Sequence, residues 1–165
     1  MKLSTFGAVS AAIALCAVAG AQTSSAPLGA SVRLGLVLPT NQDTIDATGS
    51  GLFAFGADYK LSLKLPTFGD FKSSTSISFD YFVRDDYGNL PLLANYILTK
   101  DRFSIFAGVG VGFTTLPGGN DTKFAYQAGL SYDLPTASPV YLQASFFGTE
   151  QSKLNAVGLF VGYRF

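Results

Sequence analysis

The last ten residues of the chain decide its fold, and they are Ala156-Val157-Gly158-Leu159-Phe160-Val161-Gly162-Tyr163-Arg164-Phe165. Every second side chain from Val157 to Phe165 is large and apolar, whereas the residues between them, apart from Phe160, are small or charged. Successive side chains of a β-strand point to opposite faces of the sheet, so this alternation is typical of a strand. The segment therefore predicts a strand with one continuously apolar face.

The same period of two recurs upstream in seven further segments, which cover residues 30–38, 53–61, 75–84, 92–99, 103–113, 124–133 and 140–147. In each segment one face is apolar, and the other mixes charged, hydroxyl-bearing and glycine residues; 92–99 is the least regular. Polar and turn-forming stretches separate the segments. The expected fold class is all-β, with eight antiparallel strands in up-and-down order and no helix.

Composition indicates which face points inward. Charged residues make up only 13% of the chain, about half of the roughly 25% usual in soluble domains, while 48% of residues are hydrophobic. A soluble barrel would expose its glycine-rich face to water with too few charges to solvate it. A membrane barrel instead turns the apolar face to lipid, and small residues fit a narrow eight-stranded lumen. The sequence therefore predicts a transmembrane β-barrel.

The first residues have the features of a secretory signal peptide. Lys2 gives a positive start, an apolar stretch follows, and Ala19 and Ala21 fit the small-residue cleavage pattern. We expect residues 1–21 to be removed, 22–27 to be a lead-in and 28–165 to form the barrel domain. Cys16 is the only cysteine, so the mature chain would hold no disulfide. A lipoprotein is the disfavoured alternative, because bulky Leu15 precedes that cysteine.

Two internal stretches carry a family resemblance. The segment Pro91-Leu92-Leu93-Ala94-Asn95-Tyr96, followed by Phe106-Ala107-Gly108-Val109-Gly110-Val111-Gly112, resembles the central hairpin of the small bacterial outer-membrane β-barrel domain family. This porin-like family includes OmpA-like, OmpX-like and opacity-type proteins. The ending Gly158-Leu159-Phe160-Val161-Gly162-Tyr163-Arg164-Phe165 resembles its last strand. The resemblance covers residues 28–165 and implies a fold and a location in the cell outer membrane of a Gram-negative bacterium, but no chemistry.

The resemblance also implies an orientation and partners. Both termini would lie in the periplasm, so the loops at residues 39–51, 85–89, 115–122 and 148–155 would face outside, and the turns at 65–70, 100–102 and 135–139 would face inside. The expected partners are outer-membrane lipids and the barrel-assembly machinery, and the chain is expected to be a monomer. The assembly signal would be the alternating residues of the last strand: Val157, Leu159, Val161, Tyr163 and Phe165.

Several charged residues fall on the inward face. Arg33, Asp58 and Asp80 occupy comparable depths of the first three strands, and buried charges need partners because an unpaired one is very costly. We predict a lumen ion-pair cluster of these three, with Lys60 and Arg164 toward the periplasmic end and Arg84 near the outer mouth. The cluster is interpreted as a plug that fills the barrel; an ion gate is the alternative.

No catalytic, metal or cofactor site is predicted. The chain has no histidine, so the usual bases and nucleophile pairs are missing. Acidic residues in the outer loops, such as Asp85 and Asp86, could gather divalent cations, but short acidic loops are usually just solvated. Eleven basic residues balance eleven acidic ones, which gives no reason to expect a nucleic-acid partner.

The expected function is that of an integral outer-membrane barrel with a structural or surface-interaction role and without catalysis. A narrow pore for ions or small solutes is the first alternative. A secreted, soluble, ligand-binding β-barrel is the second. Aromatic residues on the apolar face, among them Tyr59 and Tyr163, are expected to form interfacial girdles.

Overall fold

The structure is a computed structural model, and it describes residues 29–63, 66–84, 87–116, 118–150 and 152–165. The expected signal peptide and its cleavage site at Ala19 and Ala21 lie outside these residues. In chain order the elements are β1 (Ala30–Pro39), α2 (Gln42–Thr48), β2 (Leu52–Leu61), β3 (Lys72–Arg84), β4 (Tyr87–Lys100), β5 (Phe103–Leu116), β6 (Gly119–Asp133), β7 (Val140–Thr149), η1 (Ser152–Leu154) and β8 (Ala156–Arg164).

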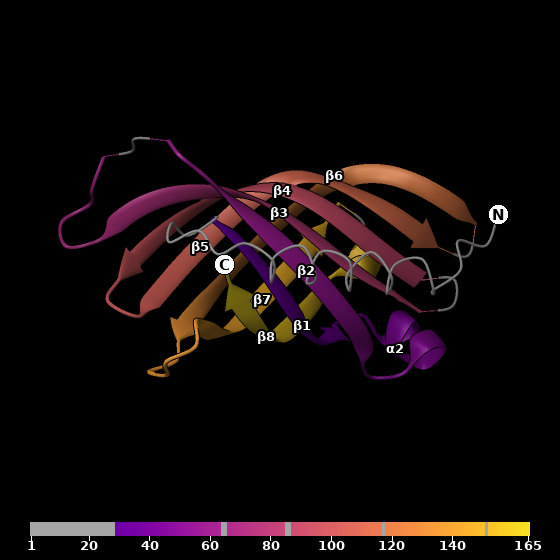
Figure 1. Cartoon of the computed structure of the whole chain (residues 1–165). Helices are drawn as coiled ribbons and strands as arrows, with labels where there is room; N and C mark the ends of the chain where they lie inside the picture. The colour runs from indigo at the N-terminus through magenta and orange to yellow at the C-terminus, as the bar shows by residue number, and fades with distance from the viewer. Residues whose placement is uncertain (1–28, 64–65, 85–86, 117, 151) are drawn as a thin grey trace.

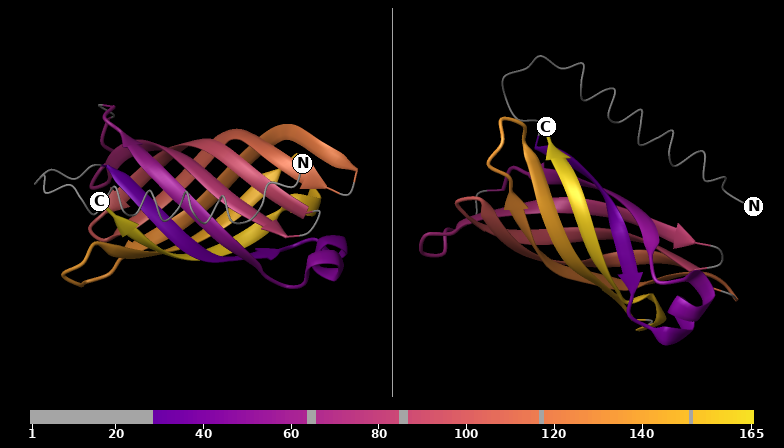
Figure 2. Two further views of the ribbon diagram at one scale, coloured as in Figure 1. Left: turned by 45° about the vertical axis from the view of Figure 1, so that its right-hand side comes forward. Right: turned by 90° about the horizontal axis from the view of Figure 1, so that it is seen from below.

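Eight strands form a closed barrel in which each strand pairs with its neighbour in sequence and β8 pairs with β1. The closing pair is antiparallel and runs from Ser31 opposite Arg164 to Pro39 opposite Ala156. Figure 1 shows the C-terminus and the start of β1 at one end of the barrel, here called the terminal end, and α2 at the other, the α2 end. Two further views show the same tilted strands around the axis (Figure 2). The predicted fold class is confirmed.

The predicted assignment of the two faces is also confirmed. On β8 the side chains of Leu159 and Val161 are 55% and 56% exposed, whereas Phe160 between them is 3% exposed. The exposed residues point away from the lumen, and the same alternation holds on the other strands: Leu34 and Leu36 are exposed, and Val37 is fully buried. The outer surface of the barrel is therefore apolar, and the inward-pointing side chains pack within the lumen.

The irregular segment at residues 92–99 belongs to β4, which pairs with a neighbouring strand on each side. Its pairing with β5 is continuous from Gly88 opposite Thr115 to Lys100 opposite Phe103. On the other side, the β3 to β4 pairing skips two positions, one of which contains Pro91. Proline has no backbone N–H to donate, which accounts for the interruption.

Two predictions about the connections were wrong. The segment 39–51 is not only a loop: Asn41 caps α2 by accepting a hydrogen bond from the Thr44 backbone N–H, and Gly49, with φ of 81°, ends the helix. The loops at residues 85–89, 115–122 and 148–155 are also shorter than predicted, because backbone pairing carries the strands into them; residues 85 and 86 lie outside the described part. Leu116 of β5 pairs with Gly119 of β6 despite the many turn-forming residues there.

The helices of the α2 end, one α-helical and one 3-10, pack on each other. The Thr44 hydroxyl of α2 donates to the Lys153 carbonyl of η1 at 2.7 Å, and the Thr40 N–H donates to the Asn155 carbonyl at 2.9 Å. Leu154 of η1 is buried over the barrel interior. In the described part of the chain, no helix is both long enough and apolar enough to cross a membrane.

Candidate functional site: a filled lumen between two open ends

The middle of the lumen holds three charged side chains from three adjacent strands. Arg33 comes from β1, Asp58 from β2 and Asp80 from β3, and each lies at an inward position because the alternation of its strand places it there. Gly56 of β2 lies opposite Arg33 of β1 on one side and opposite Asp80 of β3 on the other. A Cβ atom at Gly56 would collide with the Arg33 guanidinium, so this glycine provides the space that the cluster occupies.

Arg33 binds both carboxylates. Its Nε and Nη2 donate to Asp80 at distances of 2.7 to 3.0 Å, and its Nη1 contacts Asp58 Oδ2. Arg33 and Asp80 are 1% and 0% exposed, whereas Asp58 is 21% exposed and also accepts from the Ser31 hydroxyl at 3.1 Å. A fork of this kind uses the geometry in which a guanidinium matches a carboxylate, and it gives both carboxylates the same cationic partner.

The other three charged residues predicted for the lumen lie outside this central cluster. Arg164 is at the terminal end, where it pairs with Asp133 at 2.9 Å and lies over the Tyr141 ring, 4.4 Å from its centroid. Lys60 is exposed at the same end. Arg84 is exposed at the α2 end and donates to the Gly51 carbonyl at 3.4 Å. None of these three pairs with the central cluster; they lie toward the two ends of the barrel, on the sides where the sequence predicts them.

Directly beside the charges, toward the α2 end, lies an apolar layer that sequence reasoning missed. Phe82, Phe147 and Phe160 point inward, with ring centroids 5.4 Å apart for the first two and 6.0 Å for the last two. They pack with Val37, Ala54 and Ala156. The Arg33 guanidinium lies 5.6 Å from the Phe160 centroid and joins the two layers. The alternation already placed these rings on the inward face, but that face was interpreted as glycine-lined and charged.

On the other side of the charges lies a polar layer of amides and hydroxyls. Gln127 Nε2 donates to the Ser78 hydroxyl at 3.0 Å and to Asn95 Oδ1 at 2.6 Å, and Asn95 Nδ2 donates to the Ser76 hydroxyl at 3.3 Å. All four residues are at most 4% exposed. Their bonds run across the lumen, between β3, β4 and β6, and hold its walls together.

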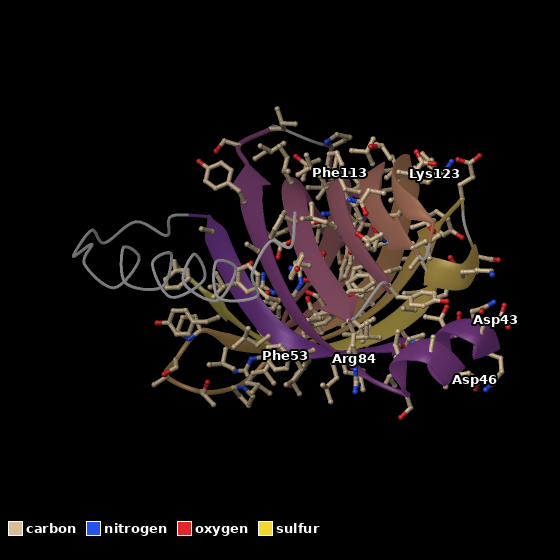
Figure 3. The ribbon with its side chains drawn as sticks, turned by 90° about the vertical axis from the view of Figure 1, so that its right-hand side faces the viewer. Asp43, Asp46, Phe53, Arg84, Phe113 and Lys123 are labelled. Atoms are coloured by element: carbon tan, nitrogen blue, oxygen red, sulfur yellow. The ribbon has the colours of Figure 1, made fainter. Side chains whose placement is uncertain are left out.

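Each end of the lumen opens into a cavity. The cavity at the terminal end has a volume of about 650 Å³ and reaches Asp58. The cavity at the α2 end has about 700 Å³ and lies between the tip of the β5 to β6 hairpin and η1. Asp43 and Asp46 on α2, and Lys123 on β6, lie apart around this end (Figure 3). Among the described residues, no three acidic, cysteine or histidine side chains are close enough together to hold a metal ion.

The sequence matches no protein-family model, and no curated protein is similar to it in sequence. Solved structures are similar in fold. The Yersinia pestis outer membrane protein Ail in a phospholipid bilayer nanodisc is 17% identical, with a TM-score of 0.55 over 82% of this chain and 98% of that one. A structure described as de novo design of transmembrane beta-barrels is 14% identical, with a TM-score of 0.57 over 87% and 100%.

The outer membrane enzyme PagL is also similar, with 12% identity and a TM-score of 0.48 over 82% of this chain and 97% of that one, which is too low to bear on activity. Identities this low show shared architecture alone. The architecture they share with this chain is a closed barrel, and here it has eight antiparallel strands. The chain therefore has the fold of the small outer-membrane β-barrels.

Proposed function

We propose that this chain is an integral barrel of a bacterial outer membrane that acts structurally, or through its α2 end as an interaction surface, and that it carries out no catalysis. The observation that carries the proposal is the combination of an apolar exterior with a filled interior. Large apolar side chains are exposed on every strand, which water would disfavour and lipid would accept.

Two rows of exposed aromatic residues support placement in a bilayer. Toward the terminal end lie Tyr59, Tyr96, Phe103, Tyr132 and Tyr163; toward the α2 end lie Phe53, Phe113, Phe124 and Tyr126. Phe53 and Phe113 appear on separate parts of the outer surface in Figure 3. Aromatic residues at two levels are typical of the girdles that sit at the two membrane interfaces.

The proposed orientation, assembly route and lack of catalysis rest mainly on the sequence. The resemblance to OmpA-like, OmpX-like and opacity-type barrels supports a periplasmic terminal end, monomeric insertion by the barrel-assembly machinery and contact with outer-membrane lipids. The absence of histidine supports a role without catalysis. Asp58 and Asp80 both bind Arg33, which favours ion pairing over acid and base chemistry.

Membrane fractionation tests the proposal. We expect the full chain to stay with the outer-membrane fraction after an alkaline wash and to migrate faster on a gel when it is not heated, as folded barrels do. Recovery in the aqueous supernatant without detergent would favour the secreted, ligand-binding barrel instead and would contradict the membrane assignment.

A narrow pore is the second candidate, because the two end cavities leave only the middle of the lumen closed. A pore would require the Arg33 cluster and the phenylalanine layer to move aside together. We favour the plug, since eight strands enclose a space that side chains can fill.

A further inference from the structure

The cavity at the terminal end is blind. Asp58 lines it, but Arg33 and Asp80, with the phenylalanine layer behind them, close the lumen beyond. A blind cavity conducts nothing, but it can hold a solute that enters from its open end. Its volume of about 650 Å³ lies within the range of about 300 to 1,000 Å³ usual for small-molecule sites.

The walls of this cavity are rich in hydroxyls and amides. Buried polar side chains from five strands, β3 to β7, line it: Ser76, Asn95, Ser104, Gln127, Ser131 and Gln143. Hydrogen bonds among Ser76, Asn95 and Gln127 hold these three in place, but the Oε1 acceptor of Gln127 has no hydrogen-bond partner among the described residues. Buried acceptors are normally satisfied, and a wall of this composition matches a ligand that carries hydroxyl groups.

The mouth of the cavity is positively charged. Lys60, Lys72 and Arg164 line it. Arg164 is paired with Asp133, and Arg33, deeper in the lumen, is shared between Asp58 on the wall and Asp80. No ion pair joins Lys60 or Lys72 to an acidic side chain within the described ranges. Two ammonium groups beside a polar cavity attract anions.

We propose that this cavity binds a small anionic group that carries both phosphate and hydroxyls, of the glycerol phosphate class, with Lys60 and Lys72 receiving the phosphate and the amide and hydroxyl walls receiving the polyol. Such a group can come from a free solute or from the headgroup of an anionic phospholipid. The inference depends on the proposed function only for the second source, because the cavity exists wherever the barrel folds.

Calorimetric titration of the full folded chain in detergent micelles tests the site, with sn-glycerol 3-phosphate as the probe. We expect saturable binding that weakens as salt is raised, and weaker binding of both glycerol and inorganic phosphate. The double substitution Lys60→Gln with Lys72→Gln should weaken binding at least tenfold. The matched control, Lys123→Gln with Lys153→Gln, removes two lysines at the α2 end and should leave binding unchanged.

A cavity-filling change gives an independent arm. Ser131→Leu adds an apolar side chain to the wall and should abolish binding while the heat-modifiable gel mobility of the folded barrel persists. No saturable binding to the wild type overturns the proposal, as does equal weakening by the two lysine pairs. Equal affinity for glycerol phosphate and inorganic phosphate overturns the role of the polar walls.

Nanodiscs distinguish the two sources. If a headgroup occupies the mouth, free glycerol phosphate should bind more weakly in phosphatidylglycerol discs than in phosphatidylcholine discs; equal binding in both supports a free solute, and no binding in either overturns the site. Failure of this proposal is distinct from failure of the membrane assignment. A chain that fractionates with membranes but binds no probe contradicts only the cavity, and a chain found in the aqueous fraction contradicts the membrane assignment alone.

Discussion

At the scale of single residues, Arg33 is the side chain on which the filled lumen most depends. It is buried and is the common partner of Asp58 and Asp80, so its removal leaves two carboxylates without a cation in the middle of the barrel. Such carboxylates would be buried away from water without a cationic partner. Removing Arg33 should therefore lower the free energy of unfolding more than breaking any ion pair on the surface.

We therefore expect Arg33→Met to lower the free energy of unfolding by about 3 to 5 kcal/mol, measured by urea titration of the barrel refolded into lipid vesicles. The control is Lys100→Gln, which breaks an exposed pair with Asp70 at 2.9 Å and should cost less than about 1 kcal/mol. Similar urea midpoints for the two variants would show that the buried cluster does not stabilise the fold.

Gly35 shows why β1 needs a small residue where it lies close to β8. A Cβ atom there would fall on the Leu159 carbonyl oxygen and lie 2.7 Å from the Phe160 ring. Since the backbone of β8 cannot yield without breaking its pairing to β1, Gly35→Ala should destabilise the barrel by about 1 to 3 kcal/mol.

Gly118→Ala is the matched control for Gly35→Ala, because a Cβ atom at Gly118 meets nothing within 4 Å. We expect its effect to stay within about 0.5 kcal/mol in the same urea titration. Equal effects at the two positions would mean that close packing against β8 is not what requires glycine at position 35.

At the scale of elements, the α2 end is held together by contacts between α2 and η1. The central one is the hydrogen bond from the buried Thr44 hydroxyl to the Lys153 carbonyl. The pair between Lys153 and Asp43, at 3.5 Å, is exposed and adds little. The bond from Thr44 to Lys153 therefore decides how firmly α2 is held against η1.

Thr44→Val keeps the shape of the side chain but removes that bond. We expect the α2 amides to exchange hydrogen about fivefold faster, which corresponds to about 1 kcal/mol of local stability. Asp46→Ala, on the exposed side of α2, should change these rates much less. Unaltered exchange in Thr44→Val would contradict the role of this contact.

The last strand supports a separate prediction about assembly. Phe165 donates its backbone N–H to the Ala30 carbonyl at 2.8 Å, and its ring lies 4.9 Å from the Tyr163 ring. If the terminal aromatic residue is read during insertion, Phe165→Ala should reduce the folded protein in the outer membrane of cells severalfold while refolding in micelles stays normal. Phe103→Ala, another exposed ring near the terminal end, should reduce neither.

The elements also show what the sequence could predict. The period of two located all eight strands and both faces, because alternation is a local property of each strand. It also placed Arg33, Asp58 and Asp80 at similar depth. It could not show that Arg164 pairs with Asp133, since register depends on pairing between distant segments. The caps of α2, Asn41 and Gly49, were visible in the sequence but flank only seven residues, too few to give a helical period.

At the scale of the whole molecule, the lumen consists of layers stacked along the barrel axis. A cavity at the α2 end is followed by the phenylalanine layer, the Arg33 cluster, the amide and hydroxyl layer and the blind cavity at the terminal end. The layers in the middle support one another, because Arg33 contacts both its carboxylates and the Phe160 ring. We expect such an interior to close the barrel to ions.

Planar-bilayer recording of the purified, refolded chain tests this account most directly. The account predicts no steady unitary conductance from the wild type across the range of potentials that the bilayer tolerates. A steady conductance in the wild type that is lost or changes its ion selectivity in Arg33→Ala would contradict it, because ions would then be passing through the layer that the structure shows as filled.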